Sequence, residues 1–304
     1  MASIKTSAEL LHQALLGKNR DQTFLDIAVT HDLIQRLEIA NKFHELYRKS
    51  LYEEINSKLS GEFKELIGHL FLSPQEFSAK MLKKGFKGFT IDDELIFEIL
   101  SAHSLEEYKL IEEAYKVETK KELKKDIEKN FSGSLRRDII NLISTERRVN
   151  PNPDMKLCEQ LCEELIRVDI KKWVDNEYLF KKIFIDCSPE ELVLIGRFYF
   201  QKTGSTLIED IEKRLSGRNK ILLREILYNN IVPHELYAEK IYKSIKGLGT
   251  NTALLNRCLA SRCRLDMPQI KEIYKWKYKN TLRQDIMGDC SGIYQKLCLY
   301  IAEC

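Results

Sequence analysis

Apolar residues recur every three or four positions along most of this chain, as they do where one face of an α-helix is buried. The segment Pro233–Lys246 shows this spacing clearly, with Tyr237, Ile241 and Ile245 each four residues apart. A proline suits the first turn of such a helix, and the glycines that follow Lys246 end it. Because the chain has only 13 glycines and 6 prolines in 304 residues, the same pattern elsewhere predicts an all-α fold with short connecting turns.

This helical pattern occurs four times, and each copy contains a Ser-Gly pair in similar surroundings. The glycines of these pairs lie about 70 to 85 residues apart, at Gly61, Gly133, Gly217 and Gly292. Each copy reads as a helix, a short loop, a second and a third helix, a short fourth helix, and a fifth helix that follows the Ser-Gly pair. The sequence therefore predicts four repeats of about five helices each.

The repeats set the boundaries that we predict within the chain. Residues 145–154 carry two prolines and two asparagines and show no apolar periodicity, so they mark a connector between two halves. The expected divisions are a short N-terminal tail at 1–6, repeat 1 at 7–72, repeat 2 at 73–144, the linker at 145–154, repeat 3 at 155–231 and repeat 4 at 232–304.

Charge and hydropathy exclude two classes of function. The net charge is +3, from 49 basic and 46 acidic side chains, so the chain lacks the strong positive charge of a nucleic-acid-binding protein. No stretch of about 20 apolar residues could cross a bilayer, and the N-terminal segment does not have the pattern of a secretory signal. We therefore expect a soluble cytosolic protein, monomeric in solution, that binds no nucleic acid.

Candidate catalytic and thiol sites are also missing from the sequence. The eight cysteines all lie in the second half, mostly within helical patterns, and their spacing is not that of a zinc site, which favours reduced thiols in the core. The six histidines are dispersed, no Ser-His-Asp spacing is recognisable, and no phosphate-binding loop is present. Enzyme activity is therefore not expected.

One loop and one carboxylate in repeat 4 carry the candidate chemistry. Two glycines in Ile245–Thr250 let the backbone turn successive carbonyl oxygens toward one point. Calcium takes about six to eight oxygen ligands, and Asp289, at the turn between the fourth and fifth helices, can supply the carboxylate that such a site needs. By itself the glycine pair is also an ordinary helix C-cap, and the position of Asp289 within the repeat favours the calcium site.

The Lys-Gly-x-Gly-Thr pattern of residues 246–250, with a distant acidic residue, resembles the calcium loops of the annexin family. The resemblance extends over essentially the whole chain and implies four repeats in a curved, disc-like, right-handed superhelical array. It also implies that the backbone oxygens of Ile245, Gly247 and Gly249 and both carboxylate oxygens of Asp289 hold calcium. The remaining positions on the ion would then be open to water or to a lipid phosphoryl oxygen.

The other three repeats depart from the family pattern at the acidic position. That position holds Lys58 in repeat 1, Asn130 in repeat 2 and Arg214 in repeat 3. A lysine or an arginine opposes calcium by its charge, and an asparagine replaces a bidentate carboxylate by a neutral amide. We therefore expect one intact calcium site, in repeat 4.

The loops of the repeats also contain candidate membrane contacts. We expect Leu248, in the calcium loop, and Trp173, in the corresponding loop of repeat 3, to lie at the level of lipid headgroups, although Trp173 could instead be buried between repeats. Lys171 and Lys172 precede Trp173 and could contact anionic lipid without calcium, with a solvated surface as the alternative. Other basic residues near these loops are Arg20, Lys58 and Arg214.

The function expected from this pattern is calcium-dependent binding to acidic phospholipid membranes, on their cytosolic face, in the organisation of membrane and cytoskeleton. The alternative is a largely calcium-independent scaffold or structural protein that associates with cytoskeletal proteins. The loss of three sites favours this alternative, and in this respect the chain is similar to the divergent alpha-giardin branch of the annexins.

Overall fold

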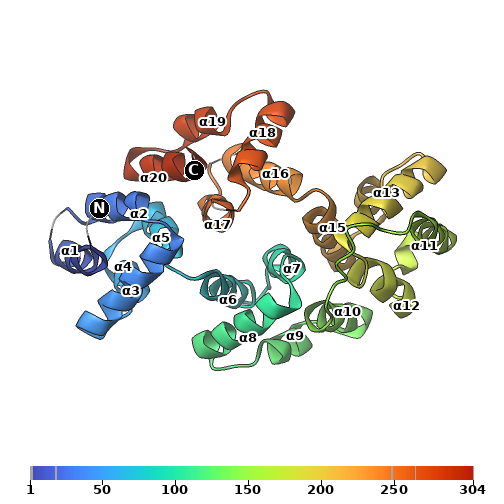
Figure 1. The fold of residues 1–304 in the computed structure, drawn as a ribbon, viewed down its shortest axis with the longest axis horizontal. Coiled ribbons are helices and arrows are strands. Elements are labelled where there is room, and N and C mark those ends of the chain that lie inside the picture. The colour runs from blue at the N-terminus through green and yellow to red at the C-terminus, as the bar shows by residue number, and fades with distance from the viewer. Residues whose placement is uncertain (1–2, 18, 248, 264, 304) are drawn as a thin grey trace. The chain divides into compact units, whose positions relative to one another are not determined.

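The computed structural model describes residues 3–17, 19–247, 249–263 and 265–303. Over these residues every regular element is a helix and none is a β-strand, so the predicted all-α fold is confirmed (Figure 1). None of the helices within these ranges is both long enough and apolar enough to cross a membrane. The chain forms two compact units, which we call unit 1 (residues 1–74 and 234–304) and unit 2 (residues 75–233).

Unit 1 joins the first and last repeats, which appear blue and red in Figure 1. Helix α17 packs on α5, and α20 packs on both α2 and α5. Repeat 1 consists of α1 (Ile4–Leu16), α2 (Arg20–Thr30), α3 (Leu33–Tyr47), α4 (Leu51–Lys58) and α5 (Gly61–Leu70). Repeat 4 consists of α16 (Pro233–Ile245), α17 (Thr252–Arg262), α18 (Met267–Tyr278), α19 (Leu282–Asp289) and α20 (Gly292–Glu303).

Unit 2 joins repeats 2 and 3, with α15 packed on α7 and on α13. Repeat 2 consists of α6 (Pro74–Gly85), α7 (Asp93–Ser101), α8 (Leu105–Thr119), α9 (Leu123–Asn130) and α10 (Gly133–Ser144). Repeat 3 consists of α11 (Met155–Arg167), η1 (Ile170–Lys172), α12 (Glu177–Phe180), η2 (Lys181–Ile185), α13 (Pro189–Thr203), α14 (Leu207–Arg214) and α15 (Gly217–Ile231). The predicted linker at 145–154 contains no helix.

Local signals explain where many of these helices begin. The third helix of repeats 1, 2 and 3 opens with a capping box, in which a side chain at the N-cap and another three residues later each bond the other's backbone N–H. Asp266 precedes α18, but its side chain does not cap this helix and instead pairs with the Arg262 guanidinium. Helix α1 begins at Ile4, earlier than the predicted residue 7, because the Ser3 hydroxyl accepts the Thr6 N–H.

The second helix of repeat 3 differs from the regular helix that we expected. It is divided into the 3₁₀ turn η1, the short helix α12 and the π-helix η2, where the Asp186 N–H donates to the Lys181 carbonyl. Two arginines in the linker explain how this helix ends. Arg147 donates to the Phe184 carbonyl at 2.6 Å, and Arg148 donates to the Asp186 carbonyl at 3.0 Å. These bonds satisfy carbonyls that would otherwise lack helical partners.

Packing holds the core of each repeat, and a recurring polar contact adds to it in repeats 2, 3 and 4. The predicted stripe of Tyr237, Ile241 and Ile245 is buried, and the seven cysteines within the described residues are buried free thiols. In three repeats a tyrosine hydroxyl on the third helix donates to an aspartate on the fourth, at 2.6 to 2.7 Å. The pairs are Tyr115–Asp126, Tyr199–Asp210 and Tyr274–Asp285. This contact fixes the fourth helix, which ends at the candidate site.

Candidate metal centre

The candidate loop of repeat 4 connects α16 to α17 and is anchored at its end. The Asn251 N–H donates to the Ser244 carbonyl at 2.8 Å, and the Asn251 side chain accepts the Leu254 N–H and so caps α17. Gly249 has a φ of 87°, a conformation that favours glycine. Leu248 lies outside the described residues. The anchored ends hold the glycine-containing segment as an exposed loop between the two helices.

Asp289 lies beside this loop although it is 39 residues from Thr250. It is the last residue of α19 and is exposed, and its Oδ2 accepts a hydrogen bond from the Thr250 hydroxyl. Among the described residues, no backbone N–H of a turn, loop or helix cap donates to the carbonyl oxygen of Gly247 or Gly249. The loop therefore brings together one carboxylate, one hydroxyl and backbone carbonyls.

Lys246 is the basic residue closest in sequence to the two glycines, and it forms an ion pair with a carboxylate other than that of Asp289. The Lys246 ammonium bonds Asp285 Oδ1 at 2.8 Å, and this hydrogen bond raises the pKa of Lys246. Burial alone would raise the pKa of Asp285, but hydrogen bonds from Lys246, Tyr274 and Asn280 outweigh it and lower that pKa. Asp289 is therefore not needed to neutralise Lys246 and can serve another cation.

The donor set fits a hard cation and no softer one. In the part of the chain that the structure describes, no three His, Cys, Asp or Glu side chains are grouped as metal ligands. A metal at Asp289 would therefore depend on oxygen atoms of the backbone, which is the chemistry of calcium rather than of zinc. The residues that could hold the ion are Gly247, Gly249 and Asp289, together with Ile245 at the end of α16.

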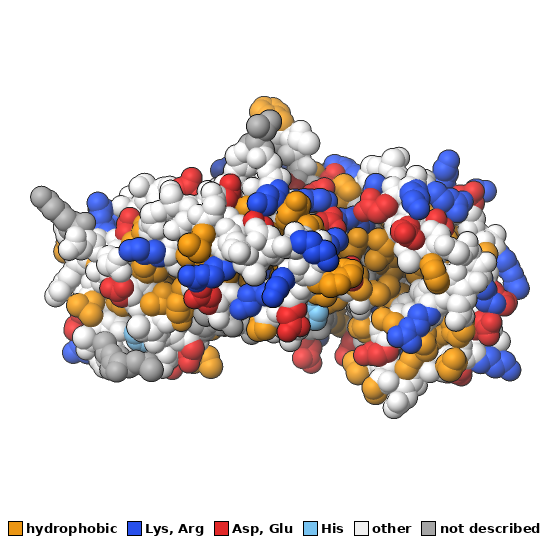
Figure 2. Space-filling model, turned by 90° about the horizontal axis from the view of Figure 1, so that it is seen from above, with side chains coloured by type: hydrophobic (Ala, Val, Ile, Leu, Met, Phe, Trp, Pro, Cys, Tyr) orange, Lys and Arg blue, Asp and Glu red, His pale blue; other side chains and the backbone are white. Residues whose placement is uncertain are grey.

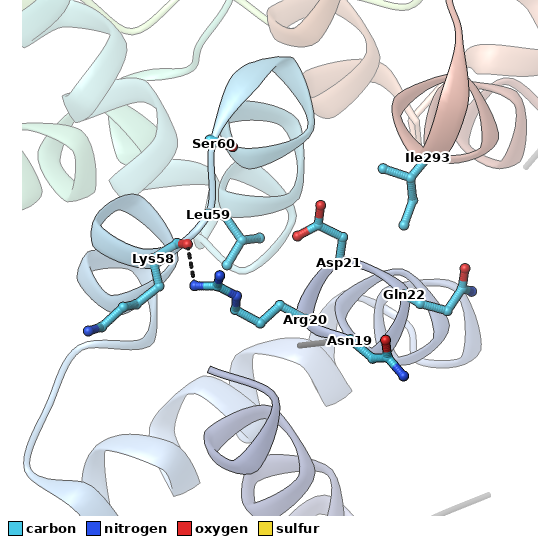
Figure 3. A pocket seen from close by; sticks show the side chains of 8 residues that line it. All are labelled: Asn19, Arg20, Asp21, Gln22, Lys58, Leu59, Ser60 and Ile293. Carbon is cyan, nitrogen blue, oxygen red and sulfur yellow. Dashed lines mark hydrogen bonds between the residues drawn. The ribbon is translucent and has the colours of Figure 1, made fainter. Parts of the chain in front are cut away.

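Repeat 1 lacks the acidic residue, and an arginine contacts the end of its fourth helix instead (Figure 3). Arg20, at the start of α2, donates from Nη1 to the carbonyl oxygen of Lys58 at 2.8 Å. Lys58 ends α4 just as Asp289 ends α19. A cavity of about 400 Å³ lies beside this contact and is lined by Asn19, Arg20, Asp21, Gln22, Lys58, Leu59, Ser60 and Ile293.

Arginines also contact backbone carbonyls near the lost sites of repeats 2 and 3, in each case from the neighbouring repeat of unit 2. Asn130 ends α9, and its carbonyl accepts from Arg218 Nη1 at 3.2 Å, while Arg218 Nε donates to Asp93 at 2.9 Å. In repeat 3 the Val174 carbonyl accepts from Arg137 Nη2 at 2.9 Å. Each of these guanidinium groups occupies a backbone carbonyl near a lost site, and each is also paired with a carboxylate, Arg218 with Asp93 and Arg137 with Asp138.

Trp173 is buried, which corrects the expectation that it lies at the level of lipid headgroups. Its side chain is 1% exposed, and its indole N–H donates to the carbonyls of Leu165 and Val168 at 3.2 and 3.1 Å. A tryptophan with its polar group satisfied inside the protein has no free group to place at an interface. Lys171 and Lys172, in contrast, are exposed, as the predicted contact with anionic lipid requires.

Phe89 is an exposed aromatic residue for which the sequence pattern predicted no role. It follows Gly88, whose φ is 116°, in the loop between α6 and α7, and its side chain is fully exposed. This loop is anchored as in repeat 4, because the Asp92 N–H donates to the Gly85 carbonyl at 2.9 Å. Alignment of the two loops by their Lys-Gly pairs places Phe89 at the position of Leu248, and this correspondence could have identified Phe89 as a candidate membrane contact.

Charge on one face of the molecule is mixed rather than separated by sign. On the face shown in Figure 2, Lys and Arg side chains alternate with Asp and Glu side chains, and hydrophobic side chains lie among them. A surface of this kind has no long-range field of one sign, so attraction to a charged partner must come from local groups.

The family model described as Annexin matches residues 6–70, 77–142 and 237–301, more than half of the chain. The chain belongs to the annexin family. The match omits repeat 3, the annexin repeat whose second helix is irregular. Mouse annexin A13 is 29% identical over 95% of this chain and 92% of its own length, and human annexin A11 is 31% identical over 97% of this chain. This annexin spans 58% of the length of annexin A11.

Solved structures agree with this assignment and confirm the four-repeat fold. Annexin III superposes with a TM-score of 0.90 at 28% identity, covering 99% of this chain and 94% of that one. A calcium-bound annexin (Sm)1 superposes with a TM-score of 0.84 at 25% identity, covering 99% and 90%. A calcium-bound alpha-14 giardin reaches 0.80 at 16% identity, covering 98% and 99%, which shows a shared fold. Annexins in general bind calcium and acidic phospholipid membranes as peripheral proteins and are not enzymes.

Proposed function

We propose that this annexin binds acidic phospholipid membranes in a calcium-dependent manner through one site in repeat 4. The observation that supports it is the hydrogen bond from Thr250 to Asp289, because it holds a carboxylate against a loop in which, among the described residues, the Gly247 and Gly249 carbonyls accept no backbone hydrogen bond between elements. In this proposal Ile245, Gly247 and Gly249 contribute backbone oxygens and Asp289 contributes its carboxylate. Calcium, when bound there, supplies open coordination positions for phosphoryl oxygens.

The residues of the chain make this binding depend on the membrane. A single carboxylate with neutral carbonyls leaves the ion with few ligands, so the protein alone holds calcium weakly. Lipid oxygens complete the ligand set, and by linkage calcium and membrane each raise the affinity for the other. The protein would then be cytosolic at low calcium and peripheral on the cytosolic face of membranes at high calcium.

Other loops contribute contacts that need no calcium. In unit 2, Lys171 and Lys172 would attract anionic headgroups, and Phe89 would place an apolar side chain among them. Phe89 replaces Trp173 in this role, because Trp173 is buried. Leu248 keeps its proposed contact in the calcium loop of repeat 4, outside the described residues.

The three arginines at the lost sites support a second candidate function. They fill the neighbourhood of the lost sites with guanidinium groups whose presence does not depend on calcium concentration. A molecule of this kind could act mainly as a scaffold between a membrane and cytoskeletal proteins, with calcium in a minor role. Co-sedimentation with filaments, in calcium and in chelator, distinguishes this function from calcium-dependent membrane binding.

The decisive test of the repeat 4 site is Asp289→Asn. We expect this variant to lose most of its calcium-dependent sedimentation with phosphatidylserine vesicles, because a neutral amide cannot supply a bidentate carboxylate. Asp26→Asn is the matched control, since it removes the same charge from an exposed position on α2. If Asp289→Asn sediments with calcium as the parent protein does, the site lies elsewhere.

A further inference from the structure

Arg20 differs from the other two arginines at the lost calcium sites in the way its charge is balanced. Arg218 is paired with Asp93 at 2.9 Å, and Arg137 is paired with Asp138 at 2.9 Å. Arg20 donates to a neutral carbonyl, and over the described residues no carboxylate lies within ion-pair distance of it. Its positive charge is therefore not taken up by a direct ion pair, although the Asp21 carboxylate lines the same cavity.

The geometry of repeat 1 holds this charge at a cavity. Figure 3 shows Arg20 extending from the start of α2 toward the end of α4, while the neighbouring Asp21 points in a different direction. The Lys58 carbonyl fixes one donor of the guanidinium, at the negative end of the α4 dipole. The cavity of about 400 Å³ also presents the side chains of Asn19, Gln22 and Ser60. Polar groups of these kinds can donate hydrogen bonds to an oxyanion.

We infer that repeat 1 binds a phosphoryl oxyanion without calcium, with Arg20 as its main donor. A guanidinium has five N–H donors, and the bond to the Lys58 carbonyl uses one of them. The others suit the planar, paired recognition of phosphoryl oxygens that arginine provides and lysine does not. This inference rests on the proposed membrane function where the oxyanion is a lipid headgroup, but a free phosphate has the same chemistry.

The position of the cavity relates this site to the calcium loop. Ile293, which lines the cavity, lies on α20 a few residues after Asp289, and both repeats belong to unit 1. One unit would therefore carry two ways of holding a phosphoryl group. Repeat 4 would use calcium held by Asp289, and repeat 1 would use a guanidinium that is always present.

The test is Arg20→Gln in the full-length protein, measured in chelator at low salt. Glutamine is polar but shorter than arginine and uncharged, so the change removes the positive charge and the guanidinium donors together. One arm measures sedimentation with vesicles of phosphatidylserine and phosphatidylcholine, and the other measures equilibrium dialysis with inorganic phosphate. We expect binding to fall about fivefold in at least one arm, as for the loss of one positive charge near a membrane surface.

Two further variants separate the site from general effects of charge and folding. Arg218→Gln removes a guanidinium whose charge Asp93 already balances, so its binding should remain near that of the parent. Arg20→Lys keeps the charge but not the paired donors, so it should bind more weakly than the parent and more tightly than Arg20→Gln. An unchanged urea midpoint of Arg20→Gln shows that repeat 1 still folds when Arg20 is changed.

Each outcome decides the inference. A fall in the vesicle arm assigns the oxyanion to a lipid headgroup, and a fall in the phosphate arm alone assigns it to a free phosphate. Unchanged binding of Arg20→Gln in both arms, or an equal fall in Arg218→Gln, overturns the inference. The calcium-dependent increment of Arg20→Gln should be intact in every case, so failure here leaves the repeat 4 proposal to its own test at Asp289.

Discussion

The residue that ends the fourth helix of each repeat determines what the neighbouring loop can attract. In repeat 4 this residue is Asp289, which accepts from Thr250, whereas in repeat 1 it is Lys58, whose carbonyl accepts from Arg20. The backbone at this position changes little between the two repeats, since each residue is the last of an eight-residue helix. A change of one side chain therefore replaces a candidate calcium ligand by a fixed cation.

Phe89 gives a prediction at the scale of one residue. Because its side chain is fully exposed and unsupported, Phe89→Ser should leave stability unchanged and weaken vesicle binding about tenfold. Full burial of such a side chain is worth about 1.5 to 3 kcal/mol, and an interfacial contact about half of that. Sedimentation at graded lipid concentrations measures the change. Phe200→Ser, at a half-exposed aromatic on α13, is the control and should bind as the parent does.

At the scale of elements, the site depends on how the fourth helix is attached. Tyr274 on α18 donates to Asp285 on α19 at 2.7 Å, and Asp285 is 3% exposed. Asp285 also holds Lys246 at 2.8 Å, next to the calcium loop. One buried carboxylate therefore connects three elements, α16, α18 and α19, and positions the end at which Asp289 lies.

Tyr274→Phe tests this attachment. A hydrogen bond to a charged group contributes about 1.5 to 3 kcal/mol, so we expect a loss of that size in the free energy of unfolding, seen as a lower urea midpoint. Tyr108→Phe is the matched control, because the Tyr108 hydroxyl is buried on α8 with no hydrogen-bond partner among the described residues. That control should be neutral or slightly stabilising. Equal losses in both variants would contradict the role given to Asp285.

At the scale of the whole molecule, sequence distance and spatial proximity differ. Repeats 1 and 4 lie at opposite ends of the chain and share unit 1, where Asn256 on α17 donates to Glu65 on α5 at 3.0 Å. Repeats 2 and 3 form unit 2, where Arg218 connects α15 to Asp93 of α7. The candidate calcium loop thus belongs to one unit, and the loops with Phe89 and Lys171 belong to the other.

This division predicts that calcium and membrane act on different parts of the molecule. With calcium and vesicles, residues 246–252 and 287–292 should gain protection from amide hydrogen exchange, because ligand binding stabilises the state that binds it. With vesicles in chelator, only segments that hold a calcium-independent contact should gain protection, residues 86–92 among them. Hydrogen exchange followed by mass spectrometry measures both. Calcium-dependent protection that persists in Asp289→Asn would contradict the assignment of the loop.

The period of apolar residues and the glycine-bounded turns were enough to predict the helices, the four repeats and the absence of strands, because these depend on local chemistry. The same reasoning drew attention to Thr250 and Asp289, which the fold brings into contact. It could not decide the position of Trp173, since an aromatic residue suits a core as well as an interface. Nor could it find that Arg218 reaches Asn130, 88 residues away, because only packing brings such groups together.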